Sequence, residues 1–309
     1  MASSASSQPR IAVIGGGAIG GFVAARLAQA GRDVTLCVRT PIAQLIIDSQ
    51  GERTIARPRI SANPGDEQPA EWVFVATKAQ DTAEATPWIK QLCQRGGSTL
   101  VVAQNGIDHE ARIRKFAGKA SILPSVVHIG AERLAPGHIL HHGGGKLIVP
   151  RGEAGKRLSA LVQNSGLVID ETDDFTTAAW TKFLANIFGN PLTALTMRRL
   201  EIFREPAIQE LARGLLEEAV AVGRACGARF PRDQVERTLT EVSNYPAKGG
   251  TSMLYDRLEG RPMEHDYMTG AVVRAAKQHG IDVPLNKAVL ALLSALEAGL
   301  PSRTMTKAQ

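Results

Sequence analysis

Cysteine is scarce in this sequence, with three in 309 residues, and the three lie far apart. They form no CxxC pair and no spacing typical of metal ligands, which excludes a disulfide framework and favours a reducing compartment. No apolar run approaches the ~20 residues that span a bilayer, and the Ser-rich residues 1–8 lack the apolar segment of a signal peptide. We therefore expect a cytoplasmic protein with no membrane partner, and a disordered tail over residues 1–8.

Aromatic residues make up only 5% of the chain, and its net charge of +6 comes from basic residues that are scattered among acidic ones. A nucleic-acid surface would need a basic patch and, for single strands, rings on which bases stack. We therefore expect no nucleic-acid partner, and attribute the charge to solvation and to attraction for small anions. His141 and His142 have no third ligand at metal-binding spacing, so we also expect no metal.

A glycine-rich turn follows the first predicted strand, residues 10–14, and leads directly into a helical pattern, residues 22–30. The turn consists of Gly15, Gly16, Gly17, Ala18, Ile19 and Gly20. This is G-x-G-x-x-G in the strand–turn–helix context that dinucleotide binding requires. Gly15 permits the tight turn, Gly17 lets the backbone approach a pyrophosphate, and Gly20 lets the helix pack closely on the strand. A purely structural glycine turn is the weaker alternative.

Arg39 stands at the end of the second predicted strand, residues 33–38. Domains that prefer NAD carry an acid at this position, which accepts hydrogen bonds from the ribose hydroxyls. A guanidinium cannot accept a hydrogen bond, but it pairs well with a 2′-phosphate. The sequence therefore predicts NADPH/NADP+ as the cofactor. The alternative is an ordinary surface arginine, with Thr40 capping a helix that starts at Pro41.

Two further polar residues follow apolar runs of the parallel-strand type. Lys78 comes after residues 72–77, and Asn105 comes after residues 100–103. In open α/β sheets the ligand lies beyond the carboxyl ends of the strands. We therefore expect Lys78 and Asn105 to face the same crevice as the glycine turn, although each alone could be an ordinary loop residue.

The chain is long for one hydrophobic core, and its hydrophobic periodicity becomes helical near residue 174. The predicted fold class is α/β, with a Rossmann-type doubly wound sheet over residues 9–173 and an all-α domain over residues 174–303. Short β-branched runs at residues 122–129, 138–142 and 146–149 are separated by glycine turns. They predict antiparallel hairpins that extend the sheet.

Lys182, Asn186 and Asn190 recur every four residues in an otherwise apolar segment, residues 180–191. On an α-helix they form one narrow stripe, and the remaining sides should be buried. Asparagine is a poor helix former, so two in register with a lysine indicate a wet cleft that binds a ligand. The alternative is a partly exposed helix with one solvated edge. The helix is predicted over residues 176–189.

Together these motifs resemble those of the ketopantoate reductases (2-dehydropantoate 2-reductases), and the likeness covers nearly the whole chain. The matching segments are residues 15–20, 39, 77–78, 104–106, 182–194, 251–256 and 263–267. The resemblance implies a Rossmann domain, a helical C-terminal domain, and NADPH-dependent reduction of 2-dehydropantoate in pantothenate and coenzyme A biosynthesis.

The resemblance also implies roles for individual residues. Lys182 would be the proton donor, and Glu264 its partner near the nicotinamide ribose and the substrate. Asn105 would contact both cofactor and substrate, and Lys78 would line the cofactor side. The residues that hold the substrate would be Asn186, Asn190 and Ser252. Ser252 lies in the first turn of a helix predicted after a glycine turn, and Glu264 in a segment, residues 261–267, that is predicted to open another helix.

The chain departs from the family pattern at Leu200, where many members carry a substrate-contacting asparagine. Leucine cannot hydrogen-bond the substrate, although Arg198 or Arg199 could hold a carboxylate instead. A small 2-oxo acid is therefore the expected substrate, with another branched 2-oxo acid as the alternative to 2-dehydropantoate. A non-catalytic NADP-sensing protein is disfavoured, because sensing needs neither Lys182 nor Glu264. The sequence does not fix the oligomeric state, and a homodimer stays open.

Overall fold

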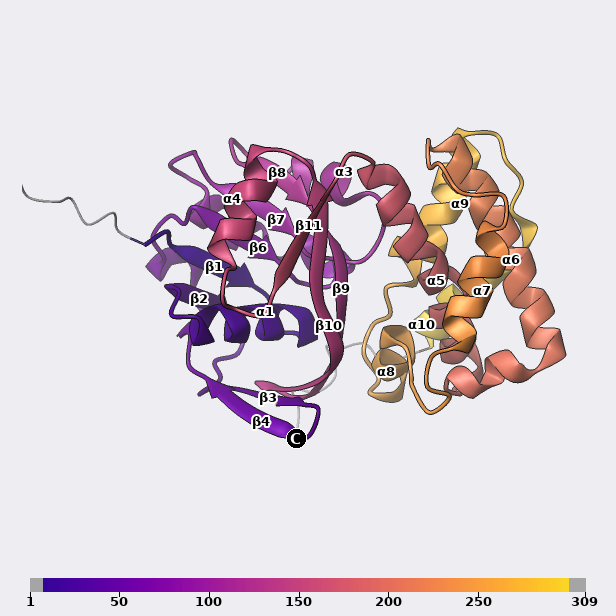
Figure 1. Cartoon of the computed structure of the whole chain (residues 1–309), viewed down its shortest axis with the longest axis horizontal. Helices are drawn as coiled ribbons and strands as arrows, with labels where there is room; N and C mark the ends of the chain where they lie inside the picture. Colours follow the sequence, from indigo (N-terminus) through magenta and orange to yellow (C-terminus); the bar gives the residue numbers. More distant parts are fainter. Residues whose placement is uncertain (1–7, 300–309) are drawn as a thin grey trace, which may run out of the picture. The chain divides into compact units, whose positions relative to one another are not determined.

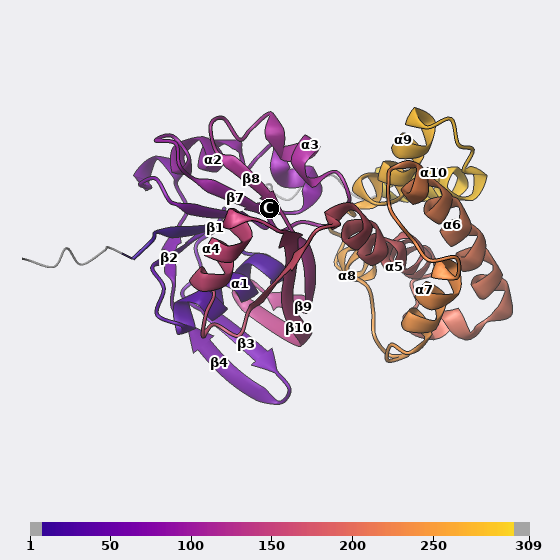
Figure 2. The same cartoon turned by 45° about the horizontal axis from the view of Figure 1, so that its top comes forward.

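The structure of the chain is a computed structural model that describes residues 8–299 (Figures 1 and 2). Residues 1–7 of the predicted tail and residues 300–303 of the predicted helical domain lie outside this range. The described chain forms two compact units, and the division falls between Phe175 and Thr176.

A six-stranded parallel sheet forms the centre of the first unit, with the strand order β5-β2-β1-β6-β7-β8. The chain thus runs outward from β1 to one edge and then from β6 to the other edge. This is the order of doubly wound dinucleotide-binding sheets, and its switch point lies between β1 and β6. The strands are β1 Ile11–Ile14, β2 Val34–Cys37, β5 Arg59–Ser61, β6 Trp72–Val75, β7 Thr99–Val102 and β8 Ser121–Pro124.

A second sheet in the same unit has the order β11-β10-β3-β4, and β9 also pairs with β10. Its strands are β3 Leu45–Ser49, β4 Glu52–Ala56, β9 Val126–Ala135, β10 His138–Pro150 and β11 Val168–Thr172. The predicted antiparallel pairing exists between β9 and β10, but β10 runs parallel to β3 and β11. The hairpin therefore belongs to a separate mixed sheet and does not extend the first one.

Strand β10 is continuous, whereas the sequence predicted two short strands interrupted by residues 143–145. The register against β9 shifts at Gly143 and Gly144, so these glycines sit at irregularities within the strand. A Cβ on Gly144 would lie 2.3 Å from the backbone oxygen of His128, which explains why glycine is needed there. The alternative prediction of a helix from Pro41 is also wrong, because β3 and β4 follow.

Helix α1 (Ala18–Gln29) lies between the two sheets of the first unit. It packs on β1 and β2 of the first sheet and on strands β3, β4, β9 and β10 of the second. Helices α2 (Thr86–Leu92) and α3 (His109–Arg114) supply apolar residues to the core on the opposite face of the first sheet. Because both faces are covered, all residues of β1, β2, β6 and β7 are buried. Helix α4 (Glu153–Leu161) packs beside β11.

The second unit is helical throughout its described part. Its helices are α5 Phe175–Thr196, α6 Pro206–Ala225, α7 Gln234–Ser243, α8 Ser252–Leu258, α9 Thr269–Gln278 and α10 Pro284–Ala298, with short 3-10 turns at Leu200–Arg204 and His265–Tyr267. The fold class expected from the sequence, α/β followed by all-α, is confirmed. Within residues 8–299 no helix is both long and apolar enough to cross a bilayer.

Two of the helix boundaries that differ from the prediction involve a proline. Helix α5 continues through Pro191 to Thr196 instead of ending at residue 189. Inside a helix, proline lacks an N–H donor and its ring crowds the carbonyl four residues earlier, so tertiary packing must offset this cost where α5 passes Pro191. The helix predicted to open at residues 261–267 begins only at Thr269, and Pro262 lies in the preceding loop.

Candidate active site

Gly15 and Gly20 build the glycine turn at the end of β1. Gly15 has a φ of +110°, and a Cβ there would lie 2.9 Å from the backbone oxygen of Ala76. A Cβ on Gly20 would lie 2.0 Å from the backbone oxygen of Gly15. Both positions therefore require glycine for the turn itself, whether or not a ligand binds.

Gly17 is different, because the protein has no packing reason for glycine there. No atom lies within 4 Å of a Cβ built on Gly17, and its φ of −74° suits any residue. Gly17 is the N-cap of α1, whose first turn carries no acidic residue. The start of α1 therefore has room beside Gly17, and the N-terminus of a helix is a place where anions bind. Binding of a pyrophosphate there stays a prediction.

Lys78 and Asn105 belong to loops that lie beside the glycine turn. Strands β1, β6 and β7 end in register, at Ile14, Val75 and Val102. A Cβ on Gly15 would lie 3.0 Å from the backbone nitrogen of Thr77, the residue before Lys78. The structure therefore brings the predicted cofactor residues of the first unit to one edge of the sheet. Their contacts with a cofactor stay a prediction.

Gln104, which the sequence did not single out, joins the loops of Lys78 and Asn105. Its side chain is buried, and its amide nitrogen lies 3.0 Å from both the backbone oxygen and the hydroxyl of Thr77. The only sequence signal was its place in the Q-N-G segment at residues 104–106.

Arg39 is exposed over 62% of its side chain and already has acidic partners. Its guanidinium lies 2.9 Å from a carboxylate oxygen of Glu84 and 3.7 Å from one of Asp81. The sequence identified the arginine but not these acids, because 42 to 45 residues separate them along the chain. Any 2′-phosphate bound by Arg39 would share the guanidinium with them.

His109 of α3 bonds to the loop that contains Gln104 and Asn105, and its ring is neutral there. Its Nε2 lies 3.0 Å from the backbone oxygen of Gln104, and a carbonyl can only accept, so Nε2 carries the proton. Burial, followed by the nearby Arg112 guanidinium, lowers the pKa of His109 to about 4. The neutral ring is thus a fixed donor to this loop throughout the physiological pH range.

We expect acid to destabilise the first unit through His109. Between about pH 6.5 and 4 the unfolded chain binds a proton at this residue and the folded chain does not, so the free energy of unfolding falls as the pH falls. The full loss is about 3 kcal/mol. Chemical denaturation at several pH values measures it, and a His109→Gln variant, which keeps a donor but cannot titrate, should lose less. An identical loss in both proteins would contradict this role.

In the second unit, α5 carries the stripe predicted from the sequence. Most of the helix is buried, whereas Lys182 and Asn186 are partly exposed. Neither side chain has a hydrogen-bond or ion-pair partner within the described part of its own unit. An amine and an amide therefore stand one helical turn apart and are available to a ligand.

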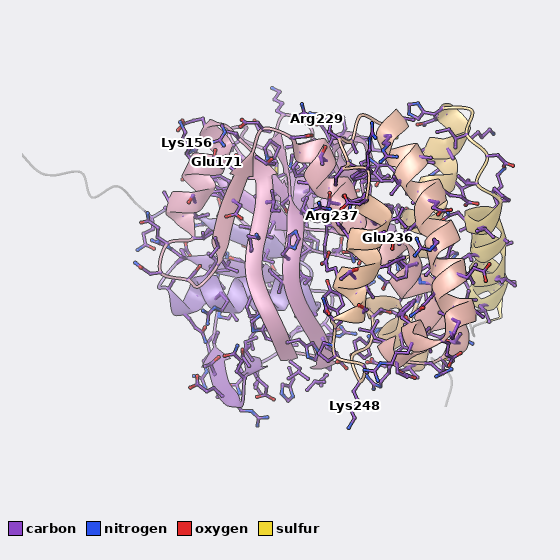
Figure 3. All side chains as sticks on the ribbon, turned by 45° about the vertical axis from the view of Figure 1, so that its right-hand side comes forward. Lys156, Glu171, Arg229, Glu236, Arg237 and Lys248 are labelled. Atoms are coloured by element: carbon purple, nitrogen blue, oxygen red, sulfur yellow. The ribbon has the colours of Figure 1, made fainter. Side chains whose placement is uncertain are left out.

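Burial lowers the pKa of the Lys182 amine, because its surroundings disfavour the charged form. The negative charge of Glu241 on α7 opposes this shift. Glu241 accepts a hydrogen bond from the Tyr245 hydroxyl at 2.8 Å. Glu236, which lies on the same helix (Figure 3), pairs with Arg213 instead. A lysine of lowered pKa gives up its proton more readily than an ordinary surface lysine. Glu241 is a residue that the sequence reasoning missed.

Asn190 and Ser252, both predicted to hold the substrate, bond to each other. Asn190 is only 4% exposed, and its side-chain oxygen accepts from the Ser252 hydroxyl at 3.0 Å and from the Met253 nitrogen at 3.1 Å. Beside this pair, the hydroxyls of Thr193 and Thr251 lie 2.7 Å apart. Asn190 therefore fixes the start of α8 to α5. Direct contact of either residue with a substrate stays a prediction.

Glu264 is buried, with 3% exposure, directly before the 3-10 turn at His265–Tyr267. Its backbone oxygen accepts from the nitrogens of Tyr267 and Met268, both at 3.0 Å. The buried position fits a residue that serves a specific partner, since carboxylates are rarely buried otherwise. Among the described residues no ion pair joins Glu264 to Lys182, so their pairing stays a prediction.

Leu200 packs against the glycine turn that precedes α8. Its nitrogen donates to the oxygen of Gly249 at 3.0 Å, and its Cδ1 lies 3.3 Å from the position of a Cβ on Gly249. The neighbouring arginines have partners of their own. Arg198 bonds to Glu201 and Glu205, and Arg199 donates to the oxygen of Lys248 at 3.2 Å. An apolar side chain thus stands near the loop of Ser252.

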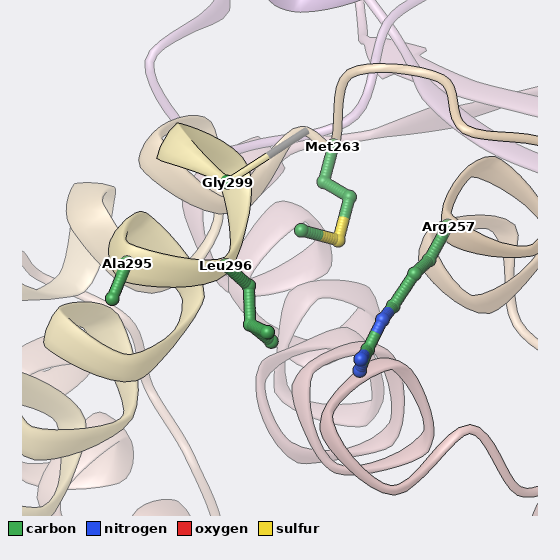
Figure 4. A pocket seen from close by; sticks show the side chains of 5 residues that line it. All are labelled: Arg257, Met263, Ala295, Leu296 and Gly299. Atoms are coloured by element: carbon green, nitrogen blue, oxygen red, sulfur yellow. The ribbon is translucent and has the colours of Figure 1, made fainter. Parts of the chain in front are cut away.

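The second unit also contains a small pocket (Figure 4). It is lined by Arg257, Met263, Ala295, Leu296 and Gly299. Met263 is the neighbour of Glu264, but none of the predicted site residues lines the pocket. We therefore assign this pocket no role in the predicted reaction.

Most of the chain is similar to one family of enzymes. Residues 11–154 match the family described as ketopantoate reductase PanE/ApbA, and residues 174–297 match its C-terminal domain. A 2-dehydropantoate 2-reductase from Caulobacter vibrioides is 38% identical over 290 residues, which cover 92% of this chain and 98% of that protein. The enzyme of the same name from Mycobacterium tuberculosis is 34% identical over 291 residues, covering 94% and 98%.

A solved structure agrees with the sequence relatives. The crystal structure of 2-dehydropantoate 2-reductase from Geobacter metallireducens matches with a TM-score of 0.87 at 26% identity, covering 93% of this chain and 99% of that one. The similarity therefore includes both units, with their parallel sheet and their helices. The chain belongs to the ketopantoate reductase family of oxidoreductases.

Proposed function

We propose that this protein reduces 2-dehydropantoate to pantoate with NADPH, a step of pantothenate and coenzyme A biosynthesis. The observation that carries the proposal is Lys182, a partly buried amine of lowered pKa without a partner in the described part of its unit. The names of the relatives support the substrate, and the open space at Gly17 supports a dinucleotide. The first unit would hold the cofactor through the glycine turn, Lys78 and Asn105.

Bound NADPH supplies the hydride for the carbonyl carbon of the 2-oxo acid. As that carbon is reduced, negative charge develops on the carbonyl oxygen, and a nearby ammonium stabilises it. Lys182 then gives a proton to this oxygen, which yields the hydroxyl of the product. Asn186 orients the substrate by hydrogen bonds without adding net charge, and Asn190 and Ser252 complete the substrate residues. Glu264 is the proposed partner of Lys182.

One assay tests this function. NADPH oxidation by the purified chain should be fast with 2-dehydropantoate and slower with 2-oxo acids that lack its hydroxymethyl group. Tight NADPH binding without oxidation on any 2-oxo acid would instead identify a sensing protein. If the chain neither bound nor oxidised NADPH, the proposal would be refuted.

A second candidate keeps the reaction and changes the substrate to another branched 2-oxo acid. The observation that favours it is Leu200, whose apolar side chain lies against the turn leading to Ser252. A site built to hydrogen-bond a hydroxyl discriminates strongly against analogues that lack it, whereas an apolar contact does not. Faster turnover on a substrate without the hydroxymethyl group would therefore select this candidate.

The proposed use of NADPH depends on Arg39. We expect the neighbouring carboxylate of Glu84 to weaken the preference for NADPH over NADH. Glu84→Gln should raise the ratio of kcat/KM for NADPH to that for NADH by up to about fivefold, since an exposed ion pair is worth about 0–1 kcal/mol. The change removes one of the two negative charges beside the guanidinium, the one that lies 2.9 Å away and would repel the 2′-phosphate, while Asp81 stays. Steady-state kinetics at low ionic strength measure the ratio, and salt should reduce the difference.

A matched control is Asp173→Asn, which breaks the exposed pair of Asp173 with Arg151 in the same unit, at 2.7 Å. This variant should leave the cofactor ratio unchanged. If Glu84→Gln gave the same ratio as the wild type, Glu84 would have no influence on cofactor choice.

A further inference from the structure

The loops of Lys78 and Asn105 are joined by one buried side-chain amide. Gln104 is 4% exposed, and its amide nitrogen reaches the backbone oxygen of Thr77 at 3.0 Å and the hydroxyl of Thr82 at 3.0 Å. The Thr82 hydroxyl gives its own proton to the oxygen of Ala79 at 2.7 Å. It is therefore free to accept from Gln104, and the two N–H groups of the amide can both be satisfied in the loop after β6.

The loop after β7 is held from its other side by α3. His109 donates to the backbone oxygen of Gln104 at 3.0 Å, and Arg112 donates to the backbone oxygen of Asn105 at 2.9 Å. The side chain of Arg112 is 5% exposed and lies 3.1 Å from Asp108. Gln104 and Asn105 are thus fixed to α3 through their backbone, while the Gln104 side chain crosses to Thr77 and Thr82.

This connection has a geometric consequence. Thr77 directly precedes Lys78, and Gln104 directly precedes Asn105. The bond from Gln104 to Thr77 therefore sets the distance between the two loops, immediately next to Lys78 and Asn105. A buried amide whose two N–H groups both have partners, as those of Gln104 do, is held in one orientation. Small displacements of positioned groups are known to reduce binding and turnover strongly.

We propose that Gln104 is a positioning residue for the dinucleotide, because its amide sets the spacing between Lys78 and Asn105. This role rests on the proposed function, in which those two residues line the cofactor site. Gln104 itself need not touch the cofactor. Loss of its amide should let the two loops move independently and weaken cofactor binding.

The chain offers a matched comparison for the experiment. Gln91, in the same unit, also donates its side-chain amide to a backbone oxygen, that of Glu67 at 2.6 Å, but it lies on α2 and not at a strand end. Gln104→Met and Gln91→Met each keep the approximate volume and remove the amide. Both should lower Tm, whereas only Gln104→Met should raise the Kd for NADPH, by about tenfold, measured by calorimetric titration of the full chain.

A second pair of variants guards against misfolding of Gln104→Met. Thr82→Val removes the hydroxyl that accepts from Gln104, and Thr82→Ser keeps it. We expect weaker NADPH binding for the valine variant and near wild-type binding for the serine variant.

The outcomes separate this role from the proposed function. Suppose that the wild-type chain binds NADPH and that Gln104→Met and Gln91→Met bind it with equal Kd values. Gln104 would then have only a structural role. The same conclusion would follow if Thr82→Val and Thr82→Ser bound NADPH equally well. A wild-type chain that bound no NADPH would overturn the proposed function and, with it, this role.

Discussion

Replacing Lys182 by alanine should lower kcat by about 10²–10⁴-fold, the usual contribution of a general acid. The Kd for NADPH should change little, because the cofactor residues predicted from the sequence lie mainly in the first unit. The physical reason is the charge that develops on the carbonyl oxygen, which no other identified cation of the α5 stripe would neutralise. Lys277→Ala, at an exposed lysine of α9, should leave kcat unchanged.

The pH dependence of kcat supplies an independent check on Lys182. Reduction needs the protonated amine, so kcat should fall as the pH rises through the pKa of Lys182. Because burial lowers this pKa, the fall should begin below the range of an ordinary lysine. Glu241→Gln removes the charge that raises the pKa and should move the fall to lower pH, while Glu236→Gln should not. A Lys182→Ala enzyme with wild-type kcat would remove this residue from the mechanism.

Replacing Gly17 by aspartate should weaken NADPH binding by at least about 100-fold, or roughly 2.7 kcal/mol, while the free protein keeps its stability. The added carboxylate would fill the space left open at Gly17 and repel a pyrophosphate at the start of α1. Aspartate is also a better N-cap than glycine, by a few tenths of a kcal/mol, and its charge suits the helix dipole. NADPH binding should therefore weaken while the stability of the free protein is kept or rises by a few tenths of a kcal/mol.

Gly20→Ala provides the contrast, because its Cβ would lie 2.0 Å from the oxygen of Gly15. This variant should lose stability as well as NADPH binding. Thermal unfolding and calorimetric titration of both variants measure the two effects. If Gly17→Asp bound NADPH as the wild type does, the start of α1 would not be the pyrophosphate site.

The sequence by itself determined the features that depend on neighbouring residues. The strand–glycine–helix succession at residues 10–30 follows from local periodicity and from the unique freedom of glycine. The stripe of Lys182 and Asn186 follows from helical geometry. The family resemblance rests on these same local segments, which is why it could be found before the fold was known.

Only the tertiary structure decided which distant segments meet. The pairing of β10 with β3 joins residues about 90 positions apart, and no local pattern specifies whether such strands form a new sheet or extend an old one. In the same way Arg39 acquires Glu84 as its partner, Gln104 bonds to Thr77 and Thr82, and burial lowers the pKa of Lys182. These properties depend on distance, desolvation and charge in three dimensions, and a linear pattern contains none of the three.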